Sequence, residues 1–309
     1  MSSTASIAMT IPFTMNKKPS DNSLPPFAFF GTPKVARDTL TFLSEVGIEP
    51  SVIITNAPAP KGRGRIVTQT QVAEFAHTHY LPIFTPPTLT PEHIKEICSY
   101  NCAFAIVVAY GKIFPETLIQ SFPLGVINVH YSLLPKYRGA SPVETALVNG
   151  ETTTGVSLQY MKKALDEGDI IASVQVPIAQ TDTSRELFEK LIRAGAILLR
   201  DNLPTISGGT ATARVQDANM ATYAPKIQKD AGYLSEHDDA LASWNKYRAY
   251  SERPGVYFYA VRDGKRIRVK VRGATYAHGV FTITRVTPEG KSEQAYNDFL
   301  RAGWEAQLF

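Results

Sequence analysis

The sequence predicts a doubly wound, mainly parallel α/β sheet followed by a small C-terminal β-barrel. From Phe27 onward, short apolar runs of strand length alternate with helix-start signals, which is the pattern of a parallel sheet with right-handed crossovers. The last third instead holds consecutive β-type runs, two of them joined by the hairpin signal Asp263-Gly264. Between the two parts, Ser207-Gly-Gly-Thr-Ala-Thr212 has the composition of a linker. We expect a disordered extension over 1–24, a sheet domain over 25–206, a linker over 207–221 and a barrel over 222–309.

The composition indicates a soluble globular protein, with an apolar fraction of 44% in 309 residues. The longest apolar run, 103–110, is far shorter than the roughly 20 residues of a membrane helix. Cys98 and Cys102 are four apart in an apolar region and are expected to be buried free thiols. These features favour a cytoplasmic protein with no membrane partner.

The first 24 residues are rich in Ser, Thr and Pro and hold no acidic residue before Asp21. They lack the continuous apolar core of a signal peptide, and Lys17 and Lys18 are their only basic residues. We interpret them as a disordered extension, with Met15 as an alternative start.

The expected sheet is built from short strands, each followed by a helix that begins at a recognisable cap or proline. Thr183-Ser-Arg-Glu186 is a capping box, and Thr68-Gln-Thr-Gln71 has the same spacing. Thr32 is expected to cap a helix that Pro33 opens, and Thr90-Pro91 opens another helix in the same way. The strands are expected at Phe27–Phe30, Ser51–Thr55, Pro82–Phe84, Ala103–Ala109, Val126–Val129, Gly155–Gln159 and Ile170–Ala179, and the helices end near Val46, Thr78, Ser121 and Asn202.

The C-terminal third carries a regular stripe of positive charge. Residues 205–309 hold 15 Lys and Arg against 11 Asp and Glu, whereas the remaining 204 residues hold 17 of each. A hairpin is expected from 256–261 and 267–271, with further β runs at 274–276 and 280–286. Period two places four cations on one face of the second hairpin strand, where they form either a solvated face or a stripe that follows phosphates. These cations are Arg266, Arg268, Lys270 and Arg272.

The candidate active site begins with Asn128 and His130. Side chains two apart on a strand share a face, so these two are expected to point into the same small volume. Ligands of doubly wound sheets bind beyond the carboxyl ends of the strands, where Tyr110-Gly111 lies on the neighbouring strand. Asp166 follows in a Gly-containing turn, Leu165-Asp-Glu-Gly-Asp169. An amide donor, an imidazole and a carboxylate are the parts of an acyl-transfer site.

Other motifs are weaker or missing. No G-x-G-x-x-G follows the first strand and no G-x-x-x-x-G-K-[ST] is present, so nucleotide binding by the sheet is unsupported. His77 and His79 have no matching ligand cluster, and no metal site is expected. The basic segment Lys61-Gly-Arg-Gly-Arg65 is either an exposed solvated loop or an arm that reaches a nucleic-acid backbone.

Taken together, a set of motifs in order along the chain resembles the 10-formyltetrahydrofolate-dependent formyltransferases. The resemblance implies a Rossmann-like catalytic domain, an OB-like C-terminal domain and Asn128, His130 and Asp166 as the catalytic trio. The motifs are Phe30-Gly-Thr-Pro33, Val108-Ala-Tyr-Gly111, Asn128-Val-His130, Ser132-Leu-Leu-Pro-Lys-Tyr-Arg-Gly-Ala-Ser-Pro142, Thr154-Gly155, Leu165-Asp-Glu-Gly-Asp169 and Thr222-Tyr-Ala-Pro-Lys226.

The same resemblance implies the substrates. The donor 10-formyltetrahydrofolate is expected at Ser132, Leu133, Leu134 and Pro135, together with Tyr110 and Gly111. Arg63-Gly-Arg65 resembles the tRNA-contacting loop of the member that formylates the α-amine of methionyl initiator tRNA for translation initiation. The residues expected to bind tRNA are Lys61, Arg63, Arg65, Arg266, Arg268, Lys270 and Arg272. We expect the chain to act as a monomer.

Two alternative functions remain open from the sequence. One is the same chemistry on a nucleotide-sugar or another small amine, which the β-rich last third and the basic loop disfavour. The other is a non-catalytic RNA-binding protein, which the intact Asn128, His130 and Asp166 disfavour. Formyl transfer to charged initiator tRNA or to a nucleotide-sugar discriminates between them.

Overall fold

The computed structural model describes residues 24–61 and 64–308. The expected extension over 1–24 lies outside the described residues except for Leu24, and Arg63 also lies outside them. No described helix is both long enough and apolar enough to cross a membrane.

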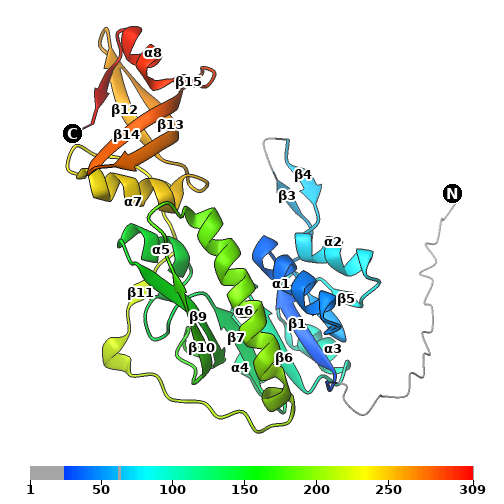
Figure 1. Ribbon diagram of the computed structural model, residues 1–309. Helices are drawn as coiled ribbons and strands as arrows, with labels where there is room; N and C mark the ends of the chain where they lie inside the picture. The colour runs from blue at the N-terminus through cyan, green and yellow to red at the C-terminus, as the bar shows by residue number, and fades with distance from the viewer. Residues whose placement is uncertain (1–23, 62–63, 309) are drawn as a thin grey trace, which may run out of the picture.

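A seven-stranded, mainly parallel sheet forms the first part of the molecule, as the sequence predicts (Figure 1). The strand order is β10-β9-β7-β6-β1-β2-β5, and the five strands from β5 to β7 run parallel. The last two, β9 and β10, are antiparallel to their neighbours. The strands are β1 (Phe27–Gly31), β2 (Val52–Ile54), β5 (Ile83–Phe84), β6 (Phe104–Val108), β7 (Val126–His130), β9 (Thr153–Tyr160) and β10 (Ile170–Pro177).

Two apolar cores cover the two faces of this sheet. Alternate residues of β1 enter different cores: Phe27 and Phe29 pack on one face, and Ala28 and Phe30 on the other. The first core includes side chains of α1 (Lys34–Glu45), α2 (Gln71–Thr78), α5 (Pro142–Val148) and α6 (Ser184–Ser207). The second includes side chains of α3 (Pro91–Cys98) and α4 (Glu116–Gln120). This is the doubly wound arrangement.

Helix starts agree with the sequence at two of the four predicted caps. Thr183 and Glu186 form the expected capping box of α6, and Thr90 caps α3 ahead of Pro91. The box predicted at Thr68 is wrong, because α2 begins at Gln71 and is capped by the hydroxyl of Thr70. The predicted Thr32 cap is also wrong, since its hydroxyl donates to Tyr110 O instead.

The basic segment after β2 belongs to a small hairpin rather than to a plain loop. β3 (Ala59–Lys61) pairs antiparallel with β4 (Ile66–Thr68), and Figure 1 shows the pair projecting from the sheet. Thr68 pairs with Ala59 as part of β4, so the following helix, α2, is capped by Thr70 instead. The hairpin places Arg65 on an exposed turn with φ 48°.

The C-terminal part is a five-stranded antiparallel sheet of small-barrel type, with the order β15-β14-β13-β12-β16. Asp263 and Gly264 join the predicted hairpin, both with positive φ. Two helices that the sequence did not indicate accompany it, α7 and α8. The elements are α7 (Ala240–Tyr250), β12 (Tyr257–Arg262), β13 (Lys265–Ala277), β14 (Val280–Pro288), β15 (Gln294–Ala295), α8 (Tyr296–Arg301) and β16 (Glu305–Gln307).

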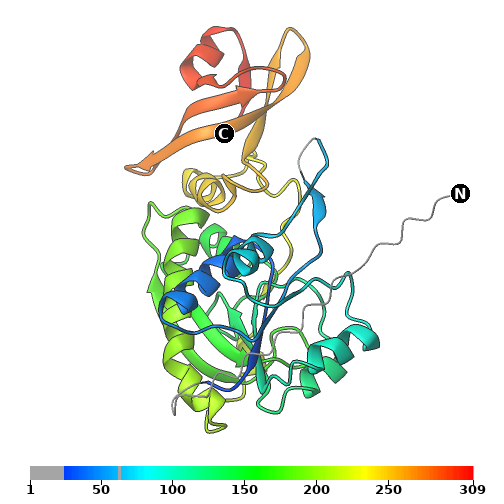
Figure 2. The ribbon, with the colours of Figure 1, turned by 90° about the vertical axis from the view of Figure 1, so that its right-hand side faces the viewer.

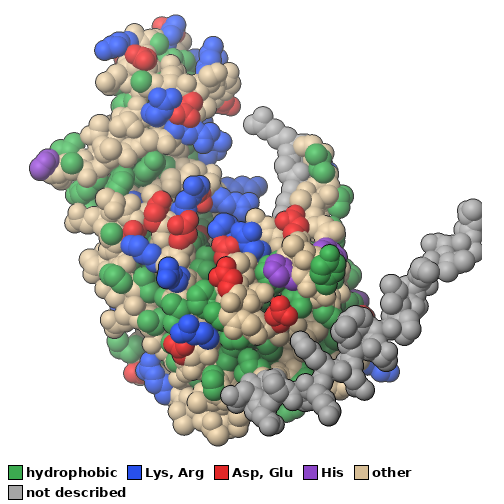
Figure 3. Space-filling model, turned by 45° about the vertical axis from the view of Figure 1, so that its right-hand side comes forward, with side chains coloured by type: hydrophobic (Ala, Val, Ile, Leu, Met, Phe, Trp, Pro, Cys, Tyr) green, Lys and Arg blue, Asp and Glu red, His purple; other side chains and the backbone are tan. Residues whose placement is uncertain are grey.

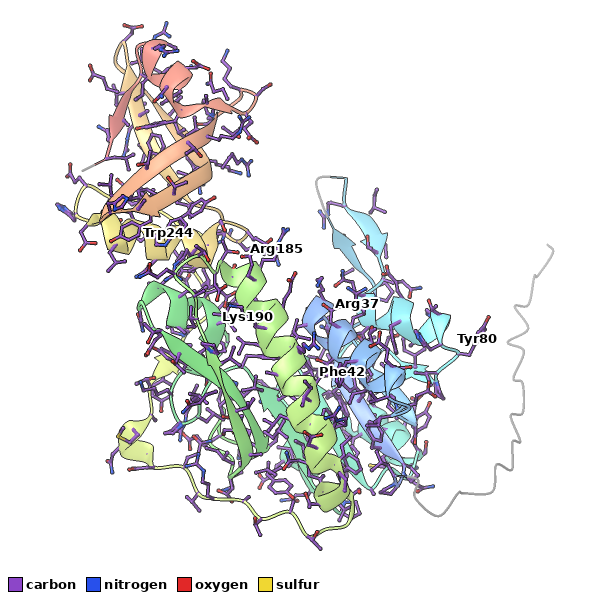
Figure 4. All side chains as sticks on the ribbon, in the orientation of Figure 1. Arg37, Phe42, Tyr80, Arg185, Lys190 and Trp244 are labelled. Atoms are coloured by element: carbon purple, nitrogen blue, oxygen red, sulfur yellow. The ribbon has the colours of Figure 1, made fainter. Side chains whose placement is uncertain are left out.

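Helix α7 joins the two parts of the molecule by packing against α5 (Figure 2). Trp244 Nε1 donates to Gln180 O at 3.0 Å, and the buried Arg248 donates to the carbonyls of Ala179 and Asp182. Arg185 and Glu252 add an ion pair across the same junction. In Figure 4 the labelled Trp244 and Arg185 lie on either side of this contact.

The expected linker is more structured than its composition indicates. Helix α6 continues to Ser207, and Arg214 then exchanges two backbone hydrogen bonds with Ile170 of β10. Further on, β11 (Tyr223–Ala224) pairs in parallel with β8 (Arg138–Gly139). We refer to residues 210–224 as the strap. The domain boundaries stated above stay a prediction.

Candidate active site

Strand β7 presents two polar side chains at its carboxyl end. Ile127 and Val129 point into the core beneath α6, so Asn128 and His130 occupy the opposite face of the strand. Burial here leaves His130 only 6% exposed.

The Asp166 side chain approaches this pair from the turn between β9 and β10. β9 runs antiparallel to β7 and ends with Tyr160 opposite Ile127, near the start of β7. The turn after β9 therefore folds back along β7 to bring Asp166 to Asn128 and His130. Asp166 adopts φ 54°, a left-handed conformation that is uncommon outside glycine and that aims its carboxylate back toward the sheet.

The three predicted catalytic side chains come together. Asn128 Nδ2 donates to Asp166 Oδ1 at 3.3 Å, and His130 Nδ1 lies 3.6 Å from Asp166 Oδ2. Two further donors reach the same carboxylate: Gln159 Nε2 at 2.9 Å and the backbone N–H of Gly139 at 2.8 Å. Because each oxygen accepts from at least one donor, the site is preorganised for the ionised carboxylate.

A backbone carbonyl fixes the imidazole. His130 Nε2 lies 2.9 Å from Tyr137 O, and a carbonyl only accepts, so Nε2 carries the proton. Nδ1 is therefore the nitrogen that remains to exchange a proton, on the side of the Asp166 carboxylate. A carboxylate beside an imidazole stabilises the charge that such an exchange creates.

The residues expected to line the folate site surround the same strand end. The loop after β7 is pinned to β9, because Ser157 Oγ donates to Ser132 O and accepts from Leu134 N. Ser132 Oγ donates to Lys136 O at 2.5 Å. Tyr110 points into the second core, where its ring meets Phe30 and Phe114 edge-on, while Gly111 is exposed. These folate contacts stay a prediction.

The cations expected to bind tRNA lie on two separate elements. On β13 they alternate with buried apolar residues as predicted, and Lys270 and Arg272 are exposed. Arg266 and Arg268 lie flat over tyrosines, with the guanidinium carbons 3.8 Å and 3.5 Å from the ring centres of Tyr259 and Tyr257. Arg65 is on the hairpin, and Lys61 ends β3. Figure 3 shows Lys and Arg side chains on the surface between the hairpin and the C-terminal sheet.

Sequence reasoning missed several residues that shape the site, chiefly Gln159 and Gln216. Gln159 lies directly opposite Asn128 in the β7–β9 pair, but an antiparallel β9 cannot be deduced from its own sequence. Gln216 lies in the strap, where the composition indicates only a linker. Within the described ranges, no group of three or more His, Cys, Asp or Glu could hold a metal ion.

Comparisons with known proteins identify the family of the chain. Residues 27–203 match the formyl transferase family. The chain is 37% identical to the methionyl-tRNA formyltransferase of Lactobacillus johnsonii, over 78% of this chain and 76% of that protein. It is 32% identical to that of Dictyoglomus turgidum, over 88% of this chain and 94% of that protein. The chain belongs to the methionyl-tRNA formyltransferases of the formyl transferase family.

Solved structures of formyltransferases share the fold at low sequence identity. The methionyl-tRNA formyltransferase from Clostridium thermocellum superposes with a TM-score of 0.58 at 16% sequence identity. The match spans 86% of this chain and 99% of that protein. An N-formyltransferase from Helicobacter canadensis, in complex with folinic acid and dTDP-3-aminofucose, superposes with a TM-score of 0.59 at 19% sequence identity. The match spans 84% of this chain and 95% of that protein. These likenesses concern the fold alone.

Proposed function

We propose that this formyltransferase transfers the formyl group of 10-formyltetrahydrofolate to the α-amino group of methionyl initiator tRNA, with Asn128, His130 and Asp166 as its catalytic residues. The observation that supports the assignment of residues is the convergence of an amide, an imidazole and a carboxylate at one strand end. The relatives that share 32–37% of the sequence over most of the chain support the substrates.

The acceptor needs little activation. An α-amine has a pKa near about 8, so a useful fraction is already neutral at pH 7. The enzyme must instead stabilise the negative charge on the formyl oxygen and remove a proton from the attacking nitrogen. One preorganised oxyanion donor is worth about 10²–10³ in rate, and a general acid or base about 10²–10⁴.

We assign these tasks to specific atoms, and the contacts support the assignment. Asn128 Nδ2 is the neutral donor for the formyl oxygen. With Nε2–H held by the Tyr137 carbonyl, His130 donates through Nδ1, and the imidazolium that this requires is balanced by Asp166. The Asp166 carboxylate accepts the amine proton through water. As the tetrahedral intermediate collapses, the bond between the formyl carbon and the folate nitrogen breaks, and this proton passes to the departing nitrogen.

We further propose that the hairpin and the face of β13 bind the phosphate backbone of the tRNA. Lys61 and Arg65 belong to the hairpin, and Arg266, Arg268, Lys270 and Arg272 to β13. Cations on two projecting elements, among them the exposed Arg65, Lys270 and Arg272, suit a polyanion larger than a nucleotide-sugar. The monomeric state and the cytoplasmic location expected from the sequence stay predictions.

A direct assay tests the function. Labelled 10-formyltetrahydrofolate is offered with methionyl initiator tRNA or with a dTDP-amino sugar. Label is expected in an alkali-labile methionyl ester on the tRNA and not on the sugar. Label on the sugar alone would reassign the acceptor, and no transfer to either would contradict the catalytic assignment.

A further inference from the structure

The catalytic turn around Asp166 is held in an unfavourable backbone conformation by groups outside the turn. Asp166 has φ 54°, which costs of order 1–3 kcal/mol and persists only where neighbouring structure enforces it. Two residues later, a Cβ on Gly168 would lie 1.5 Å from Tyr160 O, so the backbone is pressed against β9. Carbonyl groups forced into such a position need hydrogen-bond donors.

One side chain supplies both donors. Gln216 Nε2 lies 2.8 Å from Asp166 O and 2.7 Å from Gly168 O, so its amide bridges the two ends of the turn. Gln216 is 8% exposed and lies 50 residues further along the chain, in the strap. It is beyond the 27–203 segment that matches the family.

A buried arginine fixes the orientation of that amide. Arg138 Nε and Nη2 lie 3.1 Å and 2.9 Å from Gln216 Oε1, and Arg138 is only 4% exposed. A guanidinium has no acceptor, so the atom that faces it must be the amide oxygen, and the NH₂ group must face the two carbonyls. Glu167 balances the charge of Arg138 from the other side, at 3.1 Å.

The same short segment also holds the reacting groups. Arg138 lies between Tyr137, whose carbonyl fixes His130, and Gly139, whose N–H donates to Asp166 Oδ2. Backbone bonds to the strap secure this segment: Arg138 N donates to Thr222 O, and Ala140 N donates to Ala224 O. A movement of the strap would therefore displace both catalytic partners.

We propose that Gln216, oriented by Arg138, is a positioning residue that holds the Asp166 carboxylate in its reactive place. This inference rests on the proposed function and adds to it a residue that touches neither substrate. Misplacing a reacting group by about 1 Å can cost about 100-fold in rate, so loss of the Gln216 amide lowers kcat rather than substrate affinity.

Three variants of the full chain test the proposal. Gln216→Met removes the donor and the acceptor at similar volume. Gln216→Glu keeps an acceptor for Arg138 but has no donor for the two carbonyls when ionised. Gln175→Met makes the same exchange at an exposed position on β10 and is the matched control. Each is assayed for kcat, for KM of both substrates and for Tm.

The expected result is a fall in kcat of about 10- to 100-fold for Gln216→Met, with both KM values within about twofold of wild type. For Gln216→Glu, the deficit relative to wild type is expected to shrink as the pH falls, because the protonated carboxyl regains an O–H donor. This pH-dependent rescue separates positioning from a purely structural role, and it remains decisive if the Met variant fails to fold. Gln175→Met is expected to match wild type.

Any of three results would overturn the proposal while leaving the proposed function intact. The first is a Gln216→Met enzyme with wild-type kcat and a lowered Tm. The second is a Gln216→Met deficit that appears in KM for the tRNA. The third is a Gln216→Glu deficit that does not change with pH. A wild-type chain without formyl transfer would instead contradict the proposed function itself.

Discussion

At the scale of single residues, the site works through the difference between groups that only accept and groups that only donate hydrogen bonds. The Asp166 carboxylate accepts from Asn128, Gln159 and Gly139, so three donors point at its two oxygens. The imidazole of His130, whose Nε2 is held by the Tyr137 carbonyl, lies beside the same carboxylate. The arrangement is therefore specific for an ionised side chain at position 166.

We predict that Asp166→Asn lowers kcat by about 10²–10⁴ with little change in KM for the folate donor. An asparagine places an NH₂ group against donors that already point at it, and it cannot take up the amine proton. The matched control is Asp169→Asn in the same turn, whose carboxylate pairs with Lys162 at the surface. Steady-state kinetics with labelled donor measure both, and near-normal turnover by Asp166→Asn would contradict the assignment.

A second residue-scale prediction concerns Tyr110. Among the residues that the structure describes, none hydrogen-bonds its buried hydroxyl, and burial raises the pKa of this phenol to about 12. Tyr110→Phe removes an unpaired polar group from the second core, so we expect a gain in unfolding free energy of about 1 kcal/mol. Denaturant unfolding measures it.

Tyr137→Phe is the control for Tyr110→Phe, because it removes a hydroxyl that has hydrogen-bond partners. Its hydroxyl donates to Glu151 at 2.6 Å and accepts from Asn149, so the same change is expected to lower stability. A Tyr110→Phe protein that is less stable than wild type would show that its hydroxyl has a partner in solution.

At the scale of elements, helix α5 brings a carboxylate close to the junction between the two parts of the chain. Glu144 lies in the first turn of α5, and burial raises its pKa. The charged form is therefore disfavoured on folding. A carboxyl with a raised folded-state pKa stabilises the fold below its unfolded value, and this contribution is lost as the pH rises through the folded value.

We predict that Glu144→Gln raises Tm at pH 7–8 and that the gain disappears as the pH approaches about 4.5. A gain of about 2–4 °C corresponds to about 1 kcal/mol in a domain of about 150–250 residues. Thermal unfolding across this pH range measures it. An increase in Tm that is independent of pH would show that the effect is not electrostatic.

The sequence predicts elements well where one kind of signal dominates. Buried strands such as β1 and β6 are continuous apolar runs, and α3 and α6 have strong caps, so their places follow from local patterns. Helix α7 was missed because its buried side chains include Ser243, Asn245 and Arg248, which hide the apolar period. Its burial depends on carbonyl partners from the other part of the molecule.

The residues of the site likewise divide into those that local patterns predict and those that depend on distant parts of the chain. Asn128 and His130 follow from strand alternation, whereas Gln159 and Gln216 depend on pairings 31 and 50 residues away that no local pattern encodes. The resemblance supplied Asp166 as a partner; its left-handed backbone is visible only in the structure.

At the scale of the whole molecule, two basic elements project from different parts of the chain. The hairpin rises from the sheet beside α2, and the C-terminal sheet stands above α7 (Figures 1 and 2). A tRNA bound to both would contact the enzyme over a much longer distance than the catalytic site spans. Affinity for it is then dominated by phosphate contacts and falls with salt.

We predict that Arg65→Ala weakens tRNA binding and reduces the slope of log K against log salt by about 1, without changing kcat. The matched control is Arg200→Ala on α6, a partly exposed cation that pairs with Asp201 away from the hairpin. Binding to initiator tRNA at several ionic strengths measures both. An unchanged slope for Arg65→Ala would remove the hairpin from the tRNA-binding surface.

The strap has a practical consequence for recombining parts of this family. A seam cut after helix α6 would exchange Gln216 and Thr222 together with the barrel, and the recipient half would receive foreign partners for its own Arg138 and Tyr137. Placing the seam beyond Ala224 keeps the strap with its partners Arg138 and Tyr137, so that the contacts of α7 remain to be matched between the two halves. We expect chimeras joined at that point to keep the Gln216 and Thr222 contacts that hold the catalytic segment.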